Sequence, residues 1–164
     1  MTARGVFYVH SAPPALCPHV EWAVGGVLGV PASLAWTDQP AAPGTMRAEL
    51  RWEGGPGTAA GITSSLRNWK LLRFEVTEDA TPGSDGVRYS CTPSLGVFTA
   101  VIGANGDIMV PENRLRHVMA GAAGGKSNLE HELERLMGTP WDHELEPFRR
   151  AGDGAPVRWL HAAG

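Results

Sequence analysis

Cysteine is scarce in this chain of 164 residues, which contains only Cys17 and Cys91. Two cysteines do not make a disulfide scaffold in a chain of this size, and a buried free thiol is the commoner arrangement. Cys17 lies close in sequence to His10 and His19, but no Cys-x-x-Cys or His-Glu-x-x-His pair completes a tetrahedral zinc site. The sequence therefore predicts free core cysteines, an exposed His19, no metal and no cofactor.

Long apolar segments are also missing. Residues 6–9 (Val-Phe-Tyr-Val) are followed at once by His10, and they are shorter than the roughly 7–15 apolar residues of a signal peptide. Residues 22–36 are uncharged, but they include three glycines and a proline and fall short of the roughly 20 residues that span a bilayer. We therefore expect a cytoplasmic protein that has no membrane partner.

An excess of basic residues is the third absence. The chain has 14 Lys and Arg against 17 Asp and Glu, with a net charge of −3. Nucleic-acid binders usually carry a basic surface, because counterion release from phosphates drives their affinity. The segment 121–127 (Gly-Ala-Ala-Gly-Gly-Lys-Ser) resembles a phosphate-binding loop, but Ala120 stands where that motif needs glycine. We expect neither a nucleic-acid partner nor a nucleotide site.

Apolar material, by contrast, is plentiful. Hydrophobic residues make up 43% of the chain and include six tryptophans, which is enough for one core in a single domain over residues 1–164. Glycine (21) and proline (13) together form about a fifth of the residues, below the roughly 25–30% that indicates disorder. The composition predicts short elements joined by many turns.

Two segments alternate between charged and apolar residues, which is typical of strands that have one buried face. In residues 45–52, Arg47, Glu49 and Arg51 share one face. Residues 71–77 repeat the pattern, with Arg73 and Glu75 on the charged face. The apolar faces carry Met46, Ala48, Leu50 and Trp52 in the first segment and Leu72, Phe74 and Val76 in the second.

The order of elements predicts an α+β fold. Strands at 4–10, 32–37, 45–52 and 71–77 alternate with a helix that starts near Pro18 and ends at Gly29 and with a helix from Thr58 to Trp69. This β-α-β-β-α-β order is typical of a ferredoxin-like half, here residues 1–79, in which the first and third strands are central.

The second half, residues 80–164, is predicted to be a small antiparallel meander followed by C-terminal helices. Strands are expected at 87–92, 96–102 and 106–110, with a hairpin turn at Asn105-Gly106. Helices should follow from Pro111, from a capping box of Ser127 and Glu130 through Met137, and from Thr139 towards Arg150. Residues 156–161 are a candidate closing strand.

The charged face of this sheet is the candidate site. If Phe7 and Val9 point to the helices, Tyr8 and His10 lie on the opposite face between the third and fourth strands. Three interpretations fit. The arginines bind a carboxylate or phosphate, the charges pair across strands and keep the sheet soluble, or the second half packs over them. We favour the last. The candidate ligand-binding residues are Tyr8, His10, Arg47, Glu49, Arg51, Arg73 and Glu75.

Other polar features have simpler explanations. His131 and His143 lie among acidic residues, a pattern that fits a solvated helix face better than an acid–base pair, which needs burial. The turn 54–57 leads into Thr58 as a plausible N-cap and could present amide groups to an anion. Trp22 falls off the apolar stripe of its helix and is the tryptophan we expect to cover a loop or a partner.

Four stretches together resemble a known family. They are RGVFYVHSAPPALCPHVEWA (4–23), LRFEVTE (72–78), NGDI (105–108) and WDHELEPFRRAGDGAPVRWL (141–160). They resemble the small actinobacterial proteins grouped as domain of unknown function 3145. The resemblance implies a single domain in a cytoplasmic setting, and it implies no activity and no catalytic residue.

The sequence thus favours a non-enzymatic binding or regulatory protein that acts on a protein partner or a small anionic ligand. The alternative is a small-molecule enzyme that uses His10 or Tyr8 as acid–base group with an arginine anion clamp. An enzyme of this kind needs a concave pocket in which His10 and at least one arginine converge.

Overall fold

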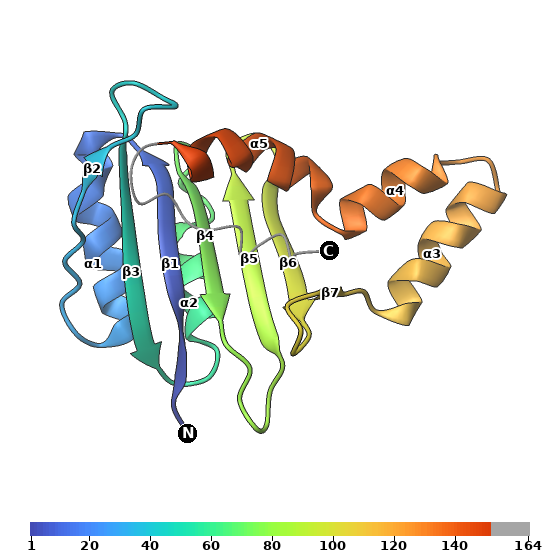
Figure 1. The fold of residues 1–164 in the computed structure, drawn as a ribbon, viewed down its shortest axis with the longest axis horizontal. Coiled ribbons are helices and arrows are strands. Elements are labelled where there is room, and N and C mark those ends of the chain that lie inside the picture. Colours follow the sequence, from blue (N-terminus) through green and yellow to red (C-terminus); the bar gives the residue numbers. More distant parts are fainter. Residues whose placement is uncertain (152–164) are drawn as a thin grey trace.

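The computed structural model describes residues 1–151, which are built around one seven-stranded antiparallel sheet (Figure 1). The strand order is β2-β3-β1-β4-β5-β6-β7, so β1 lies between β3 and β4. The predicted strand at 156–161 lies outside the described residues. The strands are β1 (Ala3–Ala12), β2 (Thr37–Asp38), β3 (Met46–Gly54), β4 (Arg73–Glu78), β5 (Gly86–Thr92), β6 (Gly96–Ile102) and β7 (Ile108–Met109).

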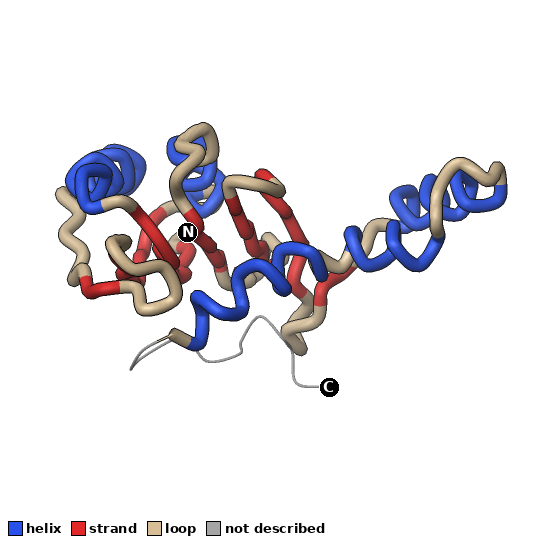
Figure 2. Tube along the Cα trace, turned by 90° about the horizontal axis from the view of Figure 1, so that it is seen from above, coloured by secondary structure: helices blue, strands red, loops and turns tan. Residues whose placement is uncertain are grey.

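Two helices, α1 (Cys17–Leu28) and α2 (Thr58–Leu66), cover one face of this sheet (Figure 2). A short 3-10 turn, Pro14–Leu16, leads into α1. The helix ends where Gly29 adopts a left-handed φ of 73°, which glycine reaches without a Cβ clash. The main core lies between these helices and the sheet, and its largest fully buried side chains include Phe7, Phe74 and Ile62.

The opposite face carries α5 (Thr139–Arg150), which crosses the strands (Figures 1 and 2). Trp141 and Leu145 of this helix are buried against Phe98 and Ala100 of β6 in a second, smaller core. The indole Nε1 of Trp141 donates to the carbonyl oxygen of Gly96 at 3.0 Å. The sheet is therefore covered on both sides, by residues far apart in the sequence.

Between β7 and α5 the chain leaves the sheet. Helices α3 (Glu112–Ala123) and α4 (Leu129–Leu136) form an arm that projects beyond the β7 edge (Figures 1 and 2). We call residues 112–137 the arm. Val118 is the only buried residue of its two helices.

The α+β class is confirmed, with five α-helices and seven strands among the described residues. The meander is confirmed as β5 and β6, and Gly106 takes a left-handed φ of 87° in the predicted hairpin turn. The last meander strand is shorter than the predicted 106–110, because β7 pairs with β6 only through Ile108 and Met109.

The second strand was predicted over 32–37, but β2 contains only Thr37 and Asp38. The residues before it pack as irregular chain instead. Leu34 is buried in the main core, and Trp36 donates its indole N–H to Glu21 of α1 at 2.7 Å. Side-chain packing on α1 thus replaces backbone pairing in this segment.

Helix boundaries differ from the predictions by one to three residues. The second helix ends at Leu66, and Trp69 follows in a turn in which its amide donates to Leu66. Its N-cap is Gly57 and not Thr58, since Gly57 has the left-handed φ of 90° that turns the chain into the helix. The N-cap of α4 is Asn128, whose side chain accepts from the His131 amide at 2.9 Å, and not Ser127.

Candidate functional site

A buried ion pair joins the charged face of the sheet to α5. Glu75 of β4 is fully buried, and Arg149 of α5 is 4% exposed. The guanidinium of Arg149 donates to the Glu75 carboxylate through Nε at 2.8 Å and Nη2 at 2.5 Å. It also donates to Asp142 at 3.0 Å. Helix α5 of the second half therefore covers the part of this face around Glu75, as in the interpretation favoured from the sequence, and leaves the part around Arg51 open.

Strand β1 adds two aromatic rings to this pair. His10 is 2% exposed, and its Nε2 lies 3.5 Å from the Glu75 carboxylate. The Tyr8 ring stacks on the His10 ring, with centroids 6.0 Å apart and planes 8° from parallel. We call Glu75, Arg149, Asp142 and His10 the buried charged layer.

The neighbouring charges in the layer favour the charged forms of Glu75 and Arg149. Burial alone would raise the pKa of Glu75, but His10 and Arg149 outweigh it, and the pKa of this carboxyl lies below its ordinary value. Burial alone would lower the pKa of Arg149, but Glu75 and Asp142 raise it above its ordinary value. A charge pair in a low-dielectric interior needs such mutual support to offset its desolvation.

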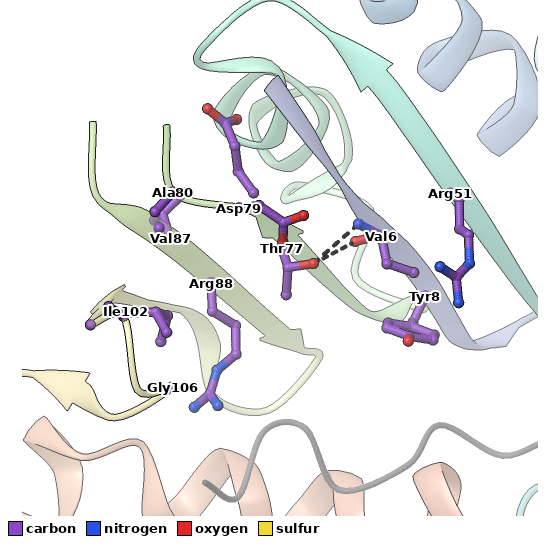
Figure 3. Close-up of a pocket in the computed structure, with 14 residues that line it drawn as sticks. Val6, Tyr8, Arg51, Thr77, Asp79, Ala80, Val87, Arg88, Ile102 and Gly106 are labelled. Carbon is purple, nitrogen blue, oxygen red and sulfur yellow. Dashed lines mark hydrogen bonds between the residues drawn. The ribbon is translucent and has the colours of Figure 1, made fainter. Parts of the chain in front are cut away.

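A groove of about 450 Å³ opens beside this layer, on the same face of the sheet (Figure 3). Tyr8 and Arg51 lie on one side and Arg88 on the other, with Val6 and Thr77 between them (Figure 3). The rest of its lining comes mainly from the start of β5, the end of β6 and the β6–β7 turn: Gly86, Val87, Ile102, Gly103, Ala104 and Gly106.

The floor of the groove lies where β1 and β4 stop pairing through their backbones. The hydroxyl of Thr77 accepts from the Val6 amide at 3.1 Å and donates to the Val6 carbonyl at 3.4 Å. Gly5 is required next to it, because a Cβ at this position would lie 1.8 Å from the carbonyl oxygen of Thr77. This side-chain bridge holds the two strands together under the groove.

Arg88 lines the groove and lies beside the buried charged layer. Its side chain is 2% exposed, and its guanidinium lies 5.8 Å from the centroid of the Phe98 ring. Burial lowers the pKa of Arg88, and the charges of Asp142 and Glu75 oppose that shift. The guanidinium of Arg88 is therefore close enough to the layer to be stabilised by its carboxylates, and it also forms part of the groove wall.

Two acidic residues also line the groove, but one of them is turned away. Glu78 accepts from the amides of Gly57 at 2.9 Å and Ala59 at 3.0 Å, at the N-terminus of α2. The anion that the turn 54–57 could attract is thus the chain's own carboxylate. Asp79 is exposed at the rim, where water screens its charge.

The structure places the seven predicted site residues in four ways: in the groove, in the buried layer, against α5 or the residue after it, and exposed on the sheet. Tyr8 and Arg51 line the groove, and His10 and Glu75 lie in the buried layer. Arg47 donates to the carbonyl of Ala151, just after α5. Arg73 donates to Ser11, lies 3.5 Å from Glu144 and stacks over Phe148. Glu49 is exposed and pairs with Tyr8 in the β1–β3 ladder.

Sequence reasoning missed Thr77, Arg88, Asp142 and Arg149. A signal existed for Arg149, which follows Trp141 and Leu145 at helical spacing on the buried stripe of α5. For Arg88 the signal was weaker. Arg88 alternates with the apolar residues of β5, but this alternation does not say which face of the sheet it is on. Ser90, two residues further along β5, pairs with Glu75 in the β4–β5 ladder, and this pairing places Arg88 on the charged face.

The remaining predicted features are placed as follows. His19, His131 and His143 are exposed, and so is Trp22. Both cysteines are buried free thiols, and burial raises the pKa of Cys91 to about 11, which keeps it protonated. Residues 1–151 contain no cluster of His, Cys, Asp and Glu that could hold a metal ion. Within the same residues, every helix is too short or too polar to cross a bilayer.

Comparison with known proteins identifies the family of this chain. No curated protein and no solved structure matches the chain. A model of the family described as "Protein of unknown function (DUF3145)" matches residues 6–162, which confirms the family resemblance seen in the sequence. Because this match covers nearly the whole chain, the chain belongs to the DUF3145 family.

Proposed function

We propose that this protein is a non-enzymatic binding protein that takes a small anionic ligand with an apolar body in the groove. The observation that carries the proposal is the placement of Arg51 and Arg88 on opposite walls of the same concave site (Figure 3). The volume of about 450 Å³ lies within the range of about 300–1,000 Å³ typical of small-molecule sites.

The chemistry of the walls supports this ligand class. Guanidinium groups present several N–H donors in a plane and bind carboxylates and phosphates, often through two hydrogen bonds. Val6, Val87 and Ile102 offer apolar contact beside them. A ligand with an acidic head and an apolar body uses both parts of the lining.

The placement of the charges in the groove favours an anion over a neutral ligand. Of the two acids in the lining, Glu78 is turned towards the N-terminus of α2 and Asp79 is exposed at the rim, whereas Arg88 lies in the wall. Arg51 adds a further positive charge from β3, where it pairs in the ladder with the uncharged Val6. An acidic ligand would compensate this charge.

The enzyme alternative receives less support. It needs His10 and an arginine to converge in an open pocket, but His10 is 2% exposed and lies beneath α5 beside Glu75. Of the two alternative acid–base groups, only Tyr8 lines the groove.

We propose further that residues 1–79 form a ferredoxin-like half. The order β2-β3-β1-β4, with α1 and α2 on one face, supports this reading. Units of this kind host many unrelated functions, so the binding proposal rests on the groove and not on the fold. A cytoplasmic location is part of the same proposal, and the two free thiols support it.

A fluorescence titration tests the binding proposal. The probe is 8-anilinonaphthalene-1-sulfonate, an apolar aromatic body with one sulfonate, added to the folded full chain. We expect saturable binding at one site, and Arg51→Glu should weaken it at least about tenfold, which corresponds to about 1.4 kcal/mol. The control is Arg67→Glu, the same charge change at an exposed arginine that ends α2 on the other side of the sheet.

A neutral probe separates charge from apolar contact. N-phenyl-1-naphthylamine has a similar body without the sulfonate, so its affinity should differ little between Arg51→Glu and the parent chain. Equal sulfonate binding by the Arg51→Glu and Arg67→Glu variants would contradict the assignment of the groove. Unsaturable binding by the parent chain would contradict it as well.

A further inference from the structure

The arm is too small to be stable through its own contacts. Helix α3 has 12 residues and α4 has 8, and isolated helices shorter than about 12–15 residues are marginal in water. Packing against the sheet normally supplies the missing stability, but the arm projects away from it (Figure 2). Val118 is the one buried residue of the two helices.

Exposed apolar side chains gather on the arm and at its base. Of the nine large hydrophobic side chains exposed among residues 1–151, Met119, Leu129 and Met137 belong to the arm. Two more, Val101 and Met109, form a cross-strand pair on the sheet edge from which the arm departs. Scattered exposed hydrophobic residues are common, whereas this concentration indicates a surface that is covered by a partner.

The two helices carry opposite charge. Between Glu112 and Ala123, α3 has two arginines against one glutamate. Between Leu129 and Leu136, α4 has three glutamates against one arginine. A surface with a basic helix beside an acidic helix is complementary to a second copy of itself. When a twofold axis relates the two copies, the basic helix of each meets the acidic helix of the other.

We propose that the arm is a self-association surface, and that its occupant is the arm of a second copy of this chain. In this dimer α3 of each copy packs beside α4 of the other around a twofold axis. The exposed Met119, Leu129 and Met137 are buried at the centre, and the opposite charges pair at the rim. The groove is not part of this interface, so the proposal is independent of the ligand.

Sedimentation equilibrium of the full chain tests the proposal. The parent chain should show a concentration-dependent species of twice the monomer mass, and Met119→Glu should abolish it. Leu71→Glu is the matched control, because Leu71 is similarly exposed, 64% against 60% for Met119, and lies outside the arm. A parent chain that stays monomeric at all concentrations would overturn the proposal and leave the arm to a different partner.

Charge reversal identifies the arm as the contact. One variant carries Arg114→Glu and Arg116→Glu in α3, and another carries Glu130→Arg and Glu132→Arg in α4. Each alone should be monomeric, while their equimolar mixture should restore the doubled mass, because reversed α3 then meets reversed α4 across the interface. Circular dichroism of each variant checks the fold. If the parent chain dimerises but the folded variants in mixture do not, the arm-to-arm pairing is wrong.

Discussion

At the scale of single residues, the pairing of Glu75 with Arg149 is the contact that joins the two halves of the chain. The two residues lie 74 positions apart in the sequence and meet in the buried space between the sheet and α5. A buried pair gains little net free energy over apolar residues, but an unpaired buried charge is very unfavourable. Each member therefore depends strongly on the other.

The first prediction follows from this dependence. Arg149→Met should lower the free energy of unfolding by about 3–5 kcal/mol, because it leaves the Glu75 carboxylate buried without its main partner. Adding Glu75→Gln to this variant should recover much of the loss. Urea unfolding of the parent chain, both single variants and the double variant measures the coupling. A coupling energy near zero would show that the pair does not act as a unit.

The contribution of Glu75 to stability should depend on pH. The pKa of Glu75 in the folded chain lies below its ordinary value, which is about 4.3 when the chain is unfolded. The stability that this ionised group contributes is therefore present above about pH 4.3 and is lost as the pH falls towards the lower, folded pKa. The destabilisation caused by Glu75→Gln should be largest at neutral pH and should shrink on acidification.

Urea midpoints at a series of pH values from neutral to acidic measure this trend. Glu53→Gln is the control, since Glu53 is exposed in its pair with Arg4 and its loss should have a small effect at every pH. A Glu75→Gln effect that stays constant, or grows as the pH falls, would mean that the carboxyl is not held ionised in the folded chain.

At the scale of elements, the cap of α2 shows how a distant side chain fixes a helix. The carboxylate of Glu78, at the end of β4, accepts from two amides in the first turn of α2. The helix begins at a left-handed glycine and has no side-chain cap of its own at Gly57. Glu78 therefore supplies the capping group and a negative charge at the positive end of the helix.

We expect Glu78→Gln to lower the free energy of unfolding by about 1 kcal/mol, as the loss of a capping acid commonly does. The neighbouring acid provides the control. Asp79 is exposed, and Asp79→Asn removes the same charge without touching α2. Thermal unfolding of both variants decides the matter, and equal shifts in the melting temperature would argue against a specific cap.

The elements that could be predicted are those with a local pattern. Alternating charge identified β3 and β4, and the Asn105-Gly106 turn identified the β6–β7 hairpin. The strand prediction is wrong for residues 32–36, because Leu34 is buried in the core and Trp36 is partly buried against α1 through tertiary contacts that no local pattern records. The cap of α2 was missed for the same reason, since Glu78 is 21 residues from Gly57 in the sequence.

At the scale of the whole molecule, the site could be predicted only in part. The alternation placed Tyr8, Arg51 and Glu75 on one face of the sheet, and all three lie at the groove or in the layer beside it. Which of them remain at an open surface depends on the path of α5 across the strands. That path is set by the burial of Trp141 and Leu145 against β6, a contact between elements that the sequence does not pair.

The same arrangement explains why the groove lies where it does. α5 covers the part of the charged face that contains Glu75 and leaves the part that contains Arg51. His10 of the buried charged layer stacks on the Tyr8 ring, and the charged groups of Glu75, Asp142 and Arg149 lie near Arg88. Groups held in this way lose little conformational freedom when a ligand binds, which favours affinity for a small molecule.

The central claim is that this groove binds an acidic ligand through its arginines, and NMR of the ¹⁵N-labelled full chain during a titration with sodium octanoate tests it most directly. Octanoate joins one carboxylate to an apolar tail. The account predicts saturable shifts at Tyr8, at the side-chain Nε of Arg51 and Arg88, and at residues 102–106, with α1, α2 and the arm unchanged. Shifts confined to the arm or to the helical face, or no saturable shift in the groove, would contradict it.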